Sequence, residues 1–387
     1  MKLRSLLCSL SLLTAALAQT PASLRIGTWN LEFLGATGNF RNNLPPRTAA
    51  DHAAIGKKLV ELGVAVVAVQ EINDDATLQQ VANGAGPTWR TVLGQSGSWD
   101  DGKTAQHIGF VYDSAVLELL FAEEVHTLPR EFGGKPIFHR VPLTAAFRHR
   151  SSGADFRLVT VHFKAGQKAD DQHKRRGEAE ALAGWLEALR TVPNEDPDVL
   201  LLGDFNSTYG TEPQLRLEQG GGFQYLVPAT PGPTIMHFAE PIDQIVAAAG
   251  CAELRRDSMQ IDNDCDAMPK ERWRQTYSDH FPVTVELLLS SDDDPAAAFA
   301  RLGPATGDAA RSGSAPPAAR GPRTDVANAS GWPPAVGSQV RIECEGNRTL
   351  EGALLEPLPP TTGWVVLRID GRTYGVPMTR VLSLRPL

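Results

Sequence analysis

Short apolar runs alternate with amphipathic helical patterns from Leu24 to Leu289. One helical pattern covers residues 47–62 and stops before Gly63, and another at residues 172–190 places three leucines and a tryptophan on one face. The apolar runs expected to be strands are residues 24–30, 64–69, 108–112, 156–163, 199–202 and 282–288. This alternation predicts a layered α/β domain, which we place at residues 23–289.

The pattern changes after Leu289. Residues 290–334 are rich in Ala, Gly, Ser and Pro without periodicity, which predicts a flexible linker. Residues 335–387 are expected to form a small all-β, barrel-like module, either SH3-like or OB-like. Its arginines make nucleic acid or cell wall candidate ligands, and the sequence leaves that ligand open. The strands expected in the module are residues 340–342, 364–369 and 373–376.

The first residues predict a signal peptide. Lys2 and Arg4 precede an apolar run, and Ala16-Leu17-Ala18 has the small-x-small form that signal peptidase cleaves. A membrane anchor is disfavoured because this run is much shorter than the roughly 20 residues that a spanning helix needs, and no later segment is long and apolar enough. We therefore expect residues 1–18 to be removed and the protein to be secreted, to the periplasm or the exterior.

Composition restricts the class of protein more than its substrate. With 387 residues, 42% hydrophobic and 21% charged, the chain can bury a sizeable core and is expected to be a globular monomer. The net charge of -8 opposes nonspecific binding to polyanions, although local basic clusters can override it. An oxidising compartment favours a disulfide between Cys251 and Cys265, which leaves Cys344 free.

Polar side chains gather where the expected strands end. Each has an ordinary explanation by itself, such as a helix-start acid for Glu71, a turn cap for Asp204 or a half-buried histidine for His162. Together they supply oxygen ligands for a hard cation and histidines for proton transfer. The set comprises Asn30, Glu71, His162, Asp204, Asn206, Asp279 and His280.

At these residues the chain resembles the endonuclease/exonuclease/phosphatase superfamily, whose fold is called DNase I-like. The matching segments follow the order of the family motifs and span the whole α/β region. They are residues 28–32, 69–71, 160–164, 202–206, 241–246 and 278–283. The resemblance implies a four-layer α/β sandwich, with two mainly antiparallel sheets face to face and helices outside.

The resemblance also implies roles. Asn30, Glu71 and Asp279 would hold Mg²⁺, or Mn²⁺ or Ca²⁺ in its place. Asp204 and Asn206 would position the attacking water or join the metal shell. His280, oriented by Asp243, would be the general base or a phosphate contact, and His162 would assist the leaving oxygen. Three residues are expected to contact the substrate phosphate: Asn206, Arg140 and Lys164.

One position departs from the family pattern. DNase I places a glutamate beside its leaving-group histidine, and the nearest residue here is Gln106. A neutral amide can orient a histidine but does not stabilise its charged form as a carboxylate does. The acid mechanism of DNase I is therefore not transferred intact.

The substrate is not fixed by the fold. A nuclease acting on DNA or RNA is favoured because residues 161–166, followed by the basic run 173–176, resemble secreted bacterial nucleases and can meet a phosphate backbone. Two alternatives stay open. One is a lipid or inositol-phosphate phosphoesterase, sphingomyelinase-like, of the same fold. The other is a surface-binding protein with a degenerate enzyme fold.

Overall fold

The computed structural model separates into two compact units, residues 1–314 and 315–387. The expected signal peptide lies outside the described residues. No helix in the described part of the chain is long and apolar enough to cross a membrane. The structure describes residues 23–39, 44–99, 104–208, 211, 216–218, 222–289, 294, 298–301, 311–312, 338–344, 348–354, 364–369, 372–377 and 381–386.

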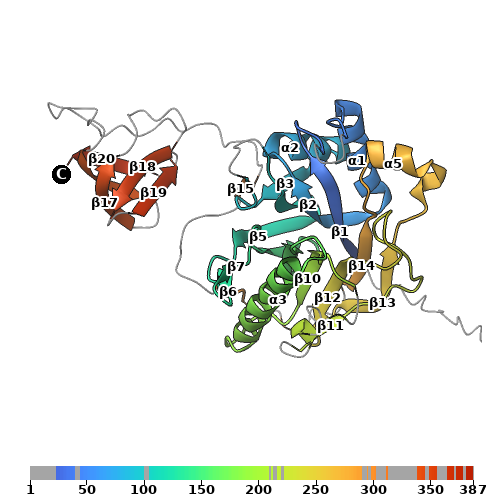
Figure 1. Ribbon diagram of the computed structural model, residues 1–387. Coiled ribbons are helices and arrows are strands. Elements are labelled where there is room, and N and C mark those ends of the chain that lie inside the picture. Colours follow the sequence, from blue (N-terminus) through green and yellow to red (C-terminus); the bar gives the residue numbers. More distant parts are fainter. Residues whose placement is uncertain are drawn as a thin grey trace, which may run out of the picture. The chain divides into compact units, whose positions relative to one another are not determined.

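Two mixed sheets form the first unit (Figure 1). The seven-stranded sheet has the order β13 (Leu254–Ile261), β14 (Val283–Leu288), β1 (Ser23–Leu34), β2 (Val64–Ile72), β4 (His107–Asp113), β3 (Trp89–Leu93) and β15 (Arg311–Ser312). The six-stranded sheet has the order β11 (Phe223–Tyr225), β12 (Asp243–Ala248), β10 (Val199–Asp204), β9 (Asp155–His162), β8 (Leu143–His149) and β5 (Leu117–Glu124). Each contains one parallel pair, β1 with β2 and β9 with β10, and the other neighbouring strands are antiparallel, so both sheets are mainly antiparallel as expected.

Helices cover the outer face of each sheet, as Figure 1 shows. The helices α1 (Ala49–Glu61), α2 (Asp75–Ala85) and α5 (Lys270–Thr276) pack on the seven-stranded sheet, and α3 (Ala169–Arg190) packs on the six-stranded one. A short hairpin of β6 (Glu131–Phe132) and β7 (Lys135–Pro136) and a 3₁₀ turn, η1 (Cys265–Ala267), complete this unit. The four-layer sandwich is confirmed.

The alternation of side chains along each strand explains the layering. In β10, Leu200 and Leu202 join the core between the two sheets, whereas Leu201 points outward to the core beneath α3. Helix α3 buries the apolar face that its sequence predicts, including Leu182 and Leu186. Helix α1 begins after Thr48, whose hydroxyl caps the backbone of Asp51, so it starts slightly later than expected.

The expected disulfide is absent: Cys251 and Cys265 are both free and buried. The residues between them form β13, an eight-residue strand that spans roughly 26 Å because an extended chain rises about 3.3 Å per residue. Cys251 packs in the core between the sheets, whereas Cys265 packs in the core beneath α1 and α5. Closeness in sequence was therefore a misleading guide to closeness in space.

Part of the segment expected to be a linker instead contacts the first unit. The carbonyl of Ala300 accepts a hydrogen bond from Arg157, and its amide donates to Glu195. Phe299 packs edge-on against Phe121, and β15 pairs with β3. These contacts extend the first unit beyond the expected boundary at residue 289.

The second unit contains one five-stranded sheet whose neighbouring strands are all antiparallel. Its order is β19 (Arg372–Pro377), β18 (Trp364–Ile369), β17 (Arg348–Leu354), β16 (Gln339–Cys344) and β20 (Val381–Pro386). A small all-β module was expected here.

Candidate active site

The predicted site residues meet at one edge of the sandwich because of the strand register. In the six-stranded sheet, Asp204 at the end of β10 lies opposite His162 of β9 and Asp243 of β12. In the seven-stranded sheet, Asn30 of β1 pairs with Gln70 of β2, next to Glu71. Asp279 and His280 immediately precede β14, which pairs with β1. Both sheets therefore deliver polar side chains to the same edge.

Asn30 joins the two sheets at this edge. Its Nδ2 donates to Asp204 Oδ2 over 3.0 Å, and its Oδ1 accepts the backbone N–H of Glu32 over 2.9 Å. His162 lies beside the same carboxylate, with Nε2 3.5 Å from Asp204 Oδ2 and 3.8 Å from Glu71 Oε1. Asn30, Glu71, His162 and Asp204 thus form one contiguous group.

A buried histidine–carboxylate pair completes the site. His280 Nδ1 lies 2.8 Å from Asp243 Oδ2, and His280 Nε2 lies 3.8 Å from Asp279 Oδ1. Ligand atoms of Asp204, Asp243 and His280 all fall within 4.8 Å of one another. Asp243 fixes the orientation of the imidazole, so its Nε2 faces the other site residues.

The backbone is strained where two of these side chains project. Glu71 has φ of 61° and Asn206 has φ of 49°, which place both residues in the left-handed region. Such a conformation costs a non-glycine residue about 1–3 kcal/mol and persists where surrounding contacts impose it. At Glu71 the backbone N–H of Phe33 donates to Oε2 over 3.2 Å, which holds the carboxylate in the site.

Unbalanced negative charge makes the site suited to a cation. Burial, with Asp279 nearby, raises the pKa of Glu71, and burial also raises the pKa of Asp279. Burial followed by the charge of Asp243 raises the pKa of Asp204 to about 7. Among the described residues, Asp243 Oδ1 and Asp279 Oδ1 have no hydrogen-bond partner. These hard oxygen donors fit a divalent cation such as Mg²⁺, which would be held by Glu71, Asp279 and the neighbouring Asn30.

The two histidines differ in charge because their neighbours differ. Burial opposes protonation of His280, but the charge and hydrogen bond of Asp243 outweigh it, so the pKa of His280 lies well above its usual value. Burial, reinforced by Arg140, holds the pKa of His162 well below its usual value. No described group bonds to His162 Nδ1. The surroundings therefore favour the protonated form of His280 and the neutral form of His162.

The residues expected to contact phosphate are placed differently from one another. Arg140 is buried; its guanidinium donates to the carbonyls of His162 and Phe163 and to Gln106 Oε1. Asn206 Nδ2 also donates to the carbonyl of Phe163. Gln106 therefore orients the arginine rather than a histidine.

Lys164 is only partly buried. Its ammonium group bonds to Asp171 over 2.9 Å and to the carbonyl of Ala165. A substrate phosphate that binds the ammonium group of Lys164 therefore has to displace Asp171.

The basic run after Lys164 is divided among three environments. Arg175 is buried and donates to the carbonyls of Lys164 and Gly166. Lys174 pairs with Asp170 and lines one hollow, and Arg176 lines another. Only part of this run is therefore available to a substrate.

Sequence reasoning missed several residues that support the site. Glu32 is buried, accepts the backbone N–H of Asp279 over 3.1 Å and pairs with Arg274. Ser278 donates to the carbonyl of Asn30 and accepts the N–H of His280. Gln70 donates to Thr160 in the opposite sheet. Glu32 and Ser278 stand within the motif segments, but their partners are more than 240 positions away.

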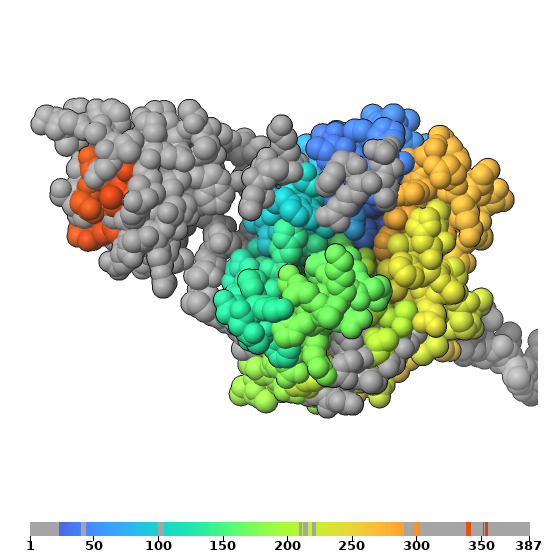
Figure 2. Space-filling view, in the orientation of Figure 1, coloured from blue at the N-terminus to red at the C-terminus, as the bar shows by residue number. Residues whose placement is uncertain are grey.

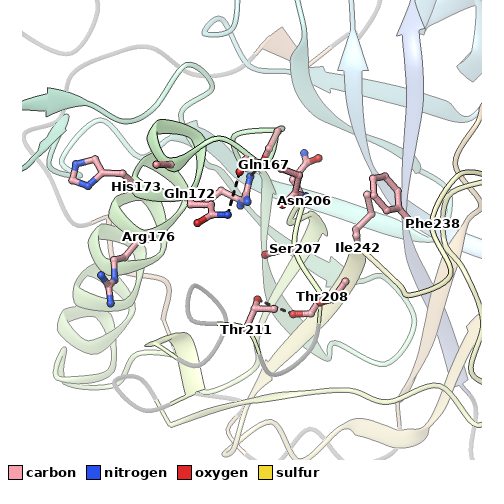
Figure 3. A pocket seen from close by; sticks show the side chains of 13 residues that line it. Gln167, Gln172, His173, Arg176, Asn206, Ser207, Thr208, Thr211, Phe238 and Ile242 are labelled. Carbon is pink, nitrogen blue, oxygen red and sulfur yellow. Dashed lines mark hydrogen bonds between the residues drawn. The ribbon is translucent and has the colours of Figure 1, made fainter.

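Two hollows border residues next to the site. A cavity of about 680 Å³ beside Asn206 is lined by Arg176, His173 and Phe238 among others. Figure 3 shows Arg176 and His173 projecting from α3 on one side and Phe238 on the other, with Asn206 between them. The surfaces of α3 (green) and of the segment that contains Phe238 (yellow) lie on one face in Figure 2.

The second hollow has a volume of about 420 Å³ and lies on the Arg140 side. Trp99, His139, Lys164 and Lys174 contribute to its lining. The Trp99 and His139 rings lie 4.6 Å apart, and burial lowers the pKa of His139 to about 4. Both hollows therefore combine aromatic and basic side chains.

Known proteins are similar to this chain in sequence or in fold. Human Endonuclease/exonuclease/phosphatase family domain-containing protein 1 is 27% identical over 225 residues, which are 53% of this chain and 37% of the human protein. The chain thus spans well under half the length of that relative.

Solved structures resemble the first unit at identities that show the fold alone. One is an endonuclease/exonuclease/phosphatase from Bacteroides vulgatus, with a TM-score of 0.51, 16% identity and coverage of 69% of this chain and 98% of that one. The human Nocturnin catalytic domain with bound sulfate has a TM-score of 0.50, 13% identity and coverage of 68% and 93%. A Bacteroides thetaiotaomicron mannosyl-6-phosphatase has a TM-score of 0.50, 16% identity and coverage of 68% and 99%.

A sequence model described as the Endonuclease/Exonuclease/phosphatase family matches residues 27–280, which is more than half of the chain. The match contains every residue of the site from Asn30 to His280. Members of this family are typically hydrolases of phosphoester bonds and generally depend on a divalent metal. This chain belongs to the Endonuclease/Exonuclease/phosphatase family.

Proposed function

We propose that the protein is a divalent-metal-dependent nuclease that hydrolyses internal phosphodiester bonds of DNA or RNA after export. The observation that carries this proposal is that two hollows with basic and aromatic lining adjoin the residues expected to contact phosphate, one at Asn206 and the other at Arg140 and Lys164. This lining extends beyond the room that a single phosphate needs. It therefore favours a polymer with several phosphates and bases over a phosphomonoester.

The lining of the hollows suits a nucleic acid strand. Arg176 and Lys174 supply positive charge for backbone phosphates, and Trp99 and Phe238 offer flat apolar surfaces on which bases can stack. Phe238 is 48% exposed, so its ring is accessible to a base. The positive charge in the two hollows opposes the repulsion of nucleic acid that is expected from the chain's net charge of -8.

Proton transfer falls to the side chains around Asp204. A bound cation would offset the charge that develops on the phosphoryl oxygens during attack. Asp204 can accept a proton from the attacking water, because its carboxylate lies in the middle of the site beside His162. His280, held by Asp243, supplies positive charge toward the phosphate.

His162 is assigned to the leaving oxygen. Its Nε2 faces Asp204 and Glu71, and Arg140 fixes the backbone on either side of it by bonding the carbonyls of His162 and Phe163. The Nε2–H of His162 can give its proton to the leaving oxygen and take up in return the proton that Asp204 accepts from water, since Nε2 lies 3.5 Å from Asp204 Oδ2. Arg140 is thereby a positioning residue in this proposal.

The test is turnover by the purified full chain on five substrates: plasmid DNA, RNA, sphingomyelin, an inositol phosphate and a sugar 6-phosphate. Each is measured with Mg²⁺ and with EDTA, and His280→Ala protein serves as the control for a contaminating hydrolase. We expect Mg²⁺-dependent cleavage of DNA or RNA that is lost in EDTA and in the variant. Turnover confined to sphingomyelin, inositol phosphate or the sugar phosphate would refute the nuclease assignment.

A further inference from the structure

A second acidic cluster lies at the end of the sandwich opposite the active site. Asp196 and Asp198 immediately precede β10, and Cys251 and Glu253 lie between β12 and β13. Asp198 and Asp204 are separated by β10, which is roughly 20 Å at about 3.3 Å per residue. The cluster is therefore independent of the catalytic residues.

The members of this cluster are close enough to share one ion. Ligand atoms of Asp198, Cys251 and Glu253 fall within 4.8 Å of one another, and so do those of Asp196, Asp198 and Asp294. Asp198 is common to both groups. It is the centre of the cluster.

Glu253 is buried without a partner for its charge. Its side chain is 4% exposed, and neither carboxylate oxygen has a hydrogen-bond partner within the described part of the chain. The same holds for Asp198 Oδ1 and Asp196 Oδ2, in residues that are 1% and 0% exposed. The carboxyl groups of Glu253 and Asp198 are close enough for a hydrogen bond, which requires a proton on one of the two.

Nearby cationic side chains form no hydrogen bond to the cluster among the described residues. Arg148 donates to Asp155, and Arg157 donates to Glu195, Thr144 and the carbonyl of Ala300. Arg256 donates through Nη2 to the carbonyls of Ala248 and Ala249, and its Nη1 has no hydrogen-bond partner in the described part of the chain. None of these hydrogen bonds reaches the unpartnered oxygens. Their charge has to be offset by protons or by a metal ion.

We propose that this cluster binds one Ca²⁺ ion, with Asp198 and Glu253 as its central ligands. Buried carboxylates that lack a partner are costly unless they coordinate a metal or become neutral. Ca²⁺ accepts six to eight oxygen ligands in irregular geometry, whereas Mg²⁺ requires a near-octahedral shell and keeps its waters. A site with several carboxylates and few ordered donors fits Ca²⁺ better.

The thiol of Cys251 argues against a soft metal. Cys251 supplies a single sulfur atom among the carboxylates of this cluster and hydrogen-bonds to Asp198. Zinc and copper sites combine cysteine and histidine ligands and use the thiolate form. The carboxylates that make up the rest of the cluster favour a hard cation.

The ion would stabilise the contact between the start of β10 and the segment that follows β14. The amide of Asp196 donates to the carbonyl of Ala298, and Glu195 accepts the backbone N–H of Ala300. A cation shared by Asp196, Asp198 and Asp294 would fasten this segment to the start of β10. The expected effect is on stability rather than on catalysis.

The test measures Ca²⁺ binding to the full chain by calorimetry, in saturating Mg²⁺ that occupies the active site. Thermal unfolding with and without Ca²⁺ then gives the change in Tm. We expect one Ca²⁺ per chain and a higher Tm. Asp198→Asn and Glu253→Gln should each weaken Ca²⁺ binding by at least about tenfold. Asp257→Asn is the matched control, since that carboxylate is 82% exposed, and it should bind Ca²⁺ as the unaltered chain does.

A crossover separates lost binding from misfolding. In EDTA, Asp198→Asn and Glu253→Gln should unfold at the same or a higher temperature than the unaltered chain, because each removes a repelling charge. In Ca²⁺ they should unfold at a lower temperature than it. If the unaltered chain binds no Ca²⁺ and both variants raise Tm equally in either buffer, shared protons neutralise the cluster and the proposal is wrong.

Discussion

Arg140 holds the end of a catalytic strand through bonds that a phosphate contact would not need. Its guanidinium bridges the carbonyls of His162 and Phe163 and the amide of Gln106. The planar fork of arginine suits several acceptors at once, and lysine does not reproduce it. The sequence motif around Arg140 predicted a phosphate contact, whereas the bonds indicate that it positions His162.

Arg140→Lys should therefore lower both stability and kcat. Loss of bonds from a buried charged donor costs about 1.5–3 kcal/mol each, so we expect unfolding free energy to fall by at least about 2 kcal/mol. Urea unfolding and steady-state kinetics measure the two effects. A variant with normal stability and a raised KM alone would restore the role of Arg140 as a phosphate contact.

Glu178 of α3 makes stability depend on pH. Burial raises its pKa to about 8, although it accepts the backbone N–H of Lys164. Because the folded protein binds this proton more tightly than the unfolded chain, whose glutamate pKa is about 4.3, this contribution to stability is lost as pH rises between those two values.

Glu178→Gln keeps the acceptor for Lys164 but cannot ionise. The fall in Tm between pH 5 and pH 9 should therefore be smaller in this variant than in the unaltered chain. Thermal unfolding across that range measures the difference. Parallel Tm curves for the two proteins would show that Glu178 does not titrate in this range.

At the scale of elements, the period of apolar residues predicted the strands that carry the site. The strands that end at His162 and Asp204 were predicted because a buried apolar run precedes each of these polar residues. Glu32 could not be assigned, because its partner Arg274 comes from a distant helix. The free cysteines were mispredicted for the same reason, since β13 separates residues that are near in sequence.

Gly203 is required by the close approach of β9 and β10. It has φ of +149°, and a Cβ there would overlap the carbonyl oxygen of Val161. Gly203→Ala should therefore force apart the strands that carry His162 and Asp204. We expect a large loss of stability and of turnover together, measured by urea unfolding and by cleavage assays.

Gly63 provides the matched control. It also has positive φ, at +67°, but nothing lies within 4 Å of an added Cβ. Gly63→Ala should cost only the strain of the left-handed conformation, about 1–2 kcal/mol, and leave turnover intact. Equal effects of the two substitutions would contradict the account of the β9–β10 contact.

At the scale of the whole molecule, the catalytic unit ends later than composition suggests. Composition marked residues 290–334 as a linker, yet Phe299, Ala300 and β15 contact the first unit. A stretch with so few apolar residues gives no periodic signal even where single residues pack. Its contacts depend on Arg157, which is buried in the sheet.

Truncation tests this boundary. A chain ending at residue 314 should keep its Tm and its turnover on a short oligonucleotide. A chain ending at residue 289 should lose stability, because Arg157 and Glu195 lose their partners at Ala300. Thermal unfolding of the two truncated chains measures this, and equal Tm values would show that the stretch adds nothing.

The central claim is that Glu71 holds a divalent cation that phosphodiester cleavage requires. The measurement is the rate of DNA or RNA cleavage as a function of Mg²⁺ concentration, for the unaltered chain and for Glu71→Gln. Glu71→Gln removes a charge that a hard cation prefers, so half-maximal rate should require at least about tenfold more Mg²⁺, with partial recovery at high concentration. Cleavage that persists in EDTA, or an unchanged Mg²⁺ dependence in Glu71→Gln, would contradict the account.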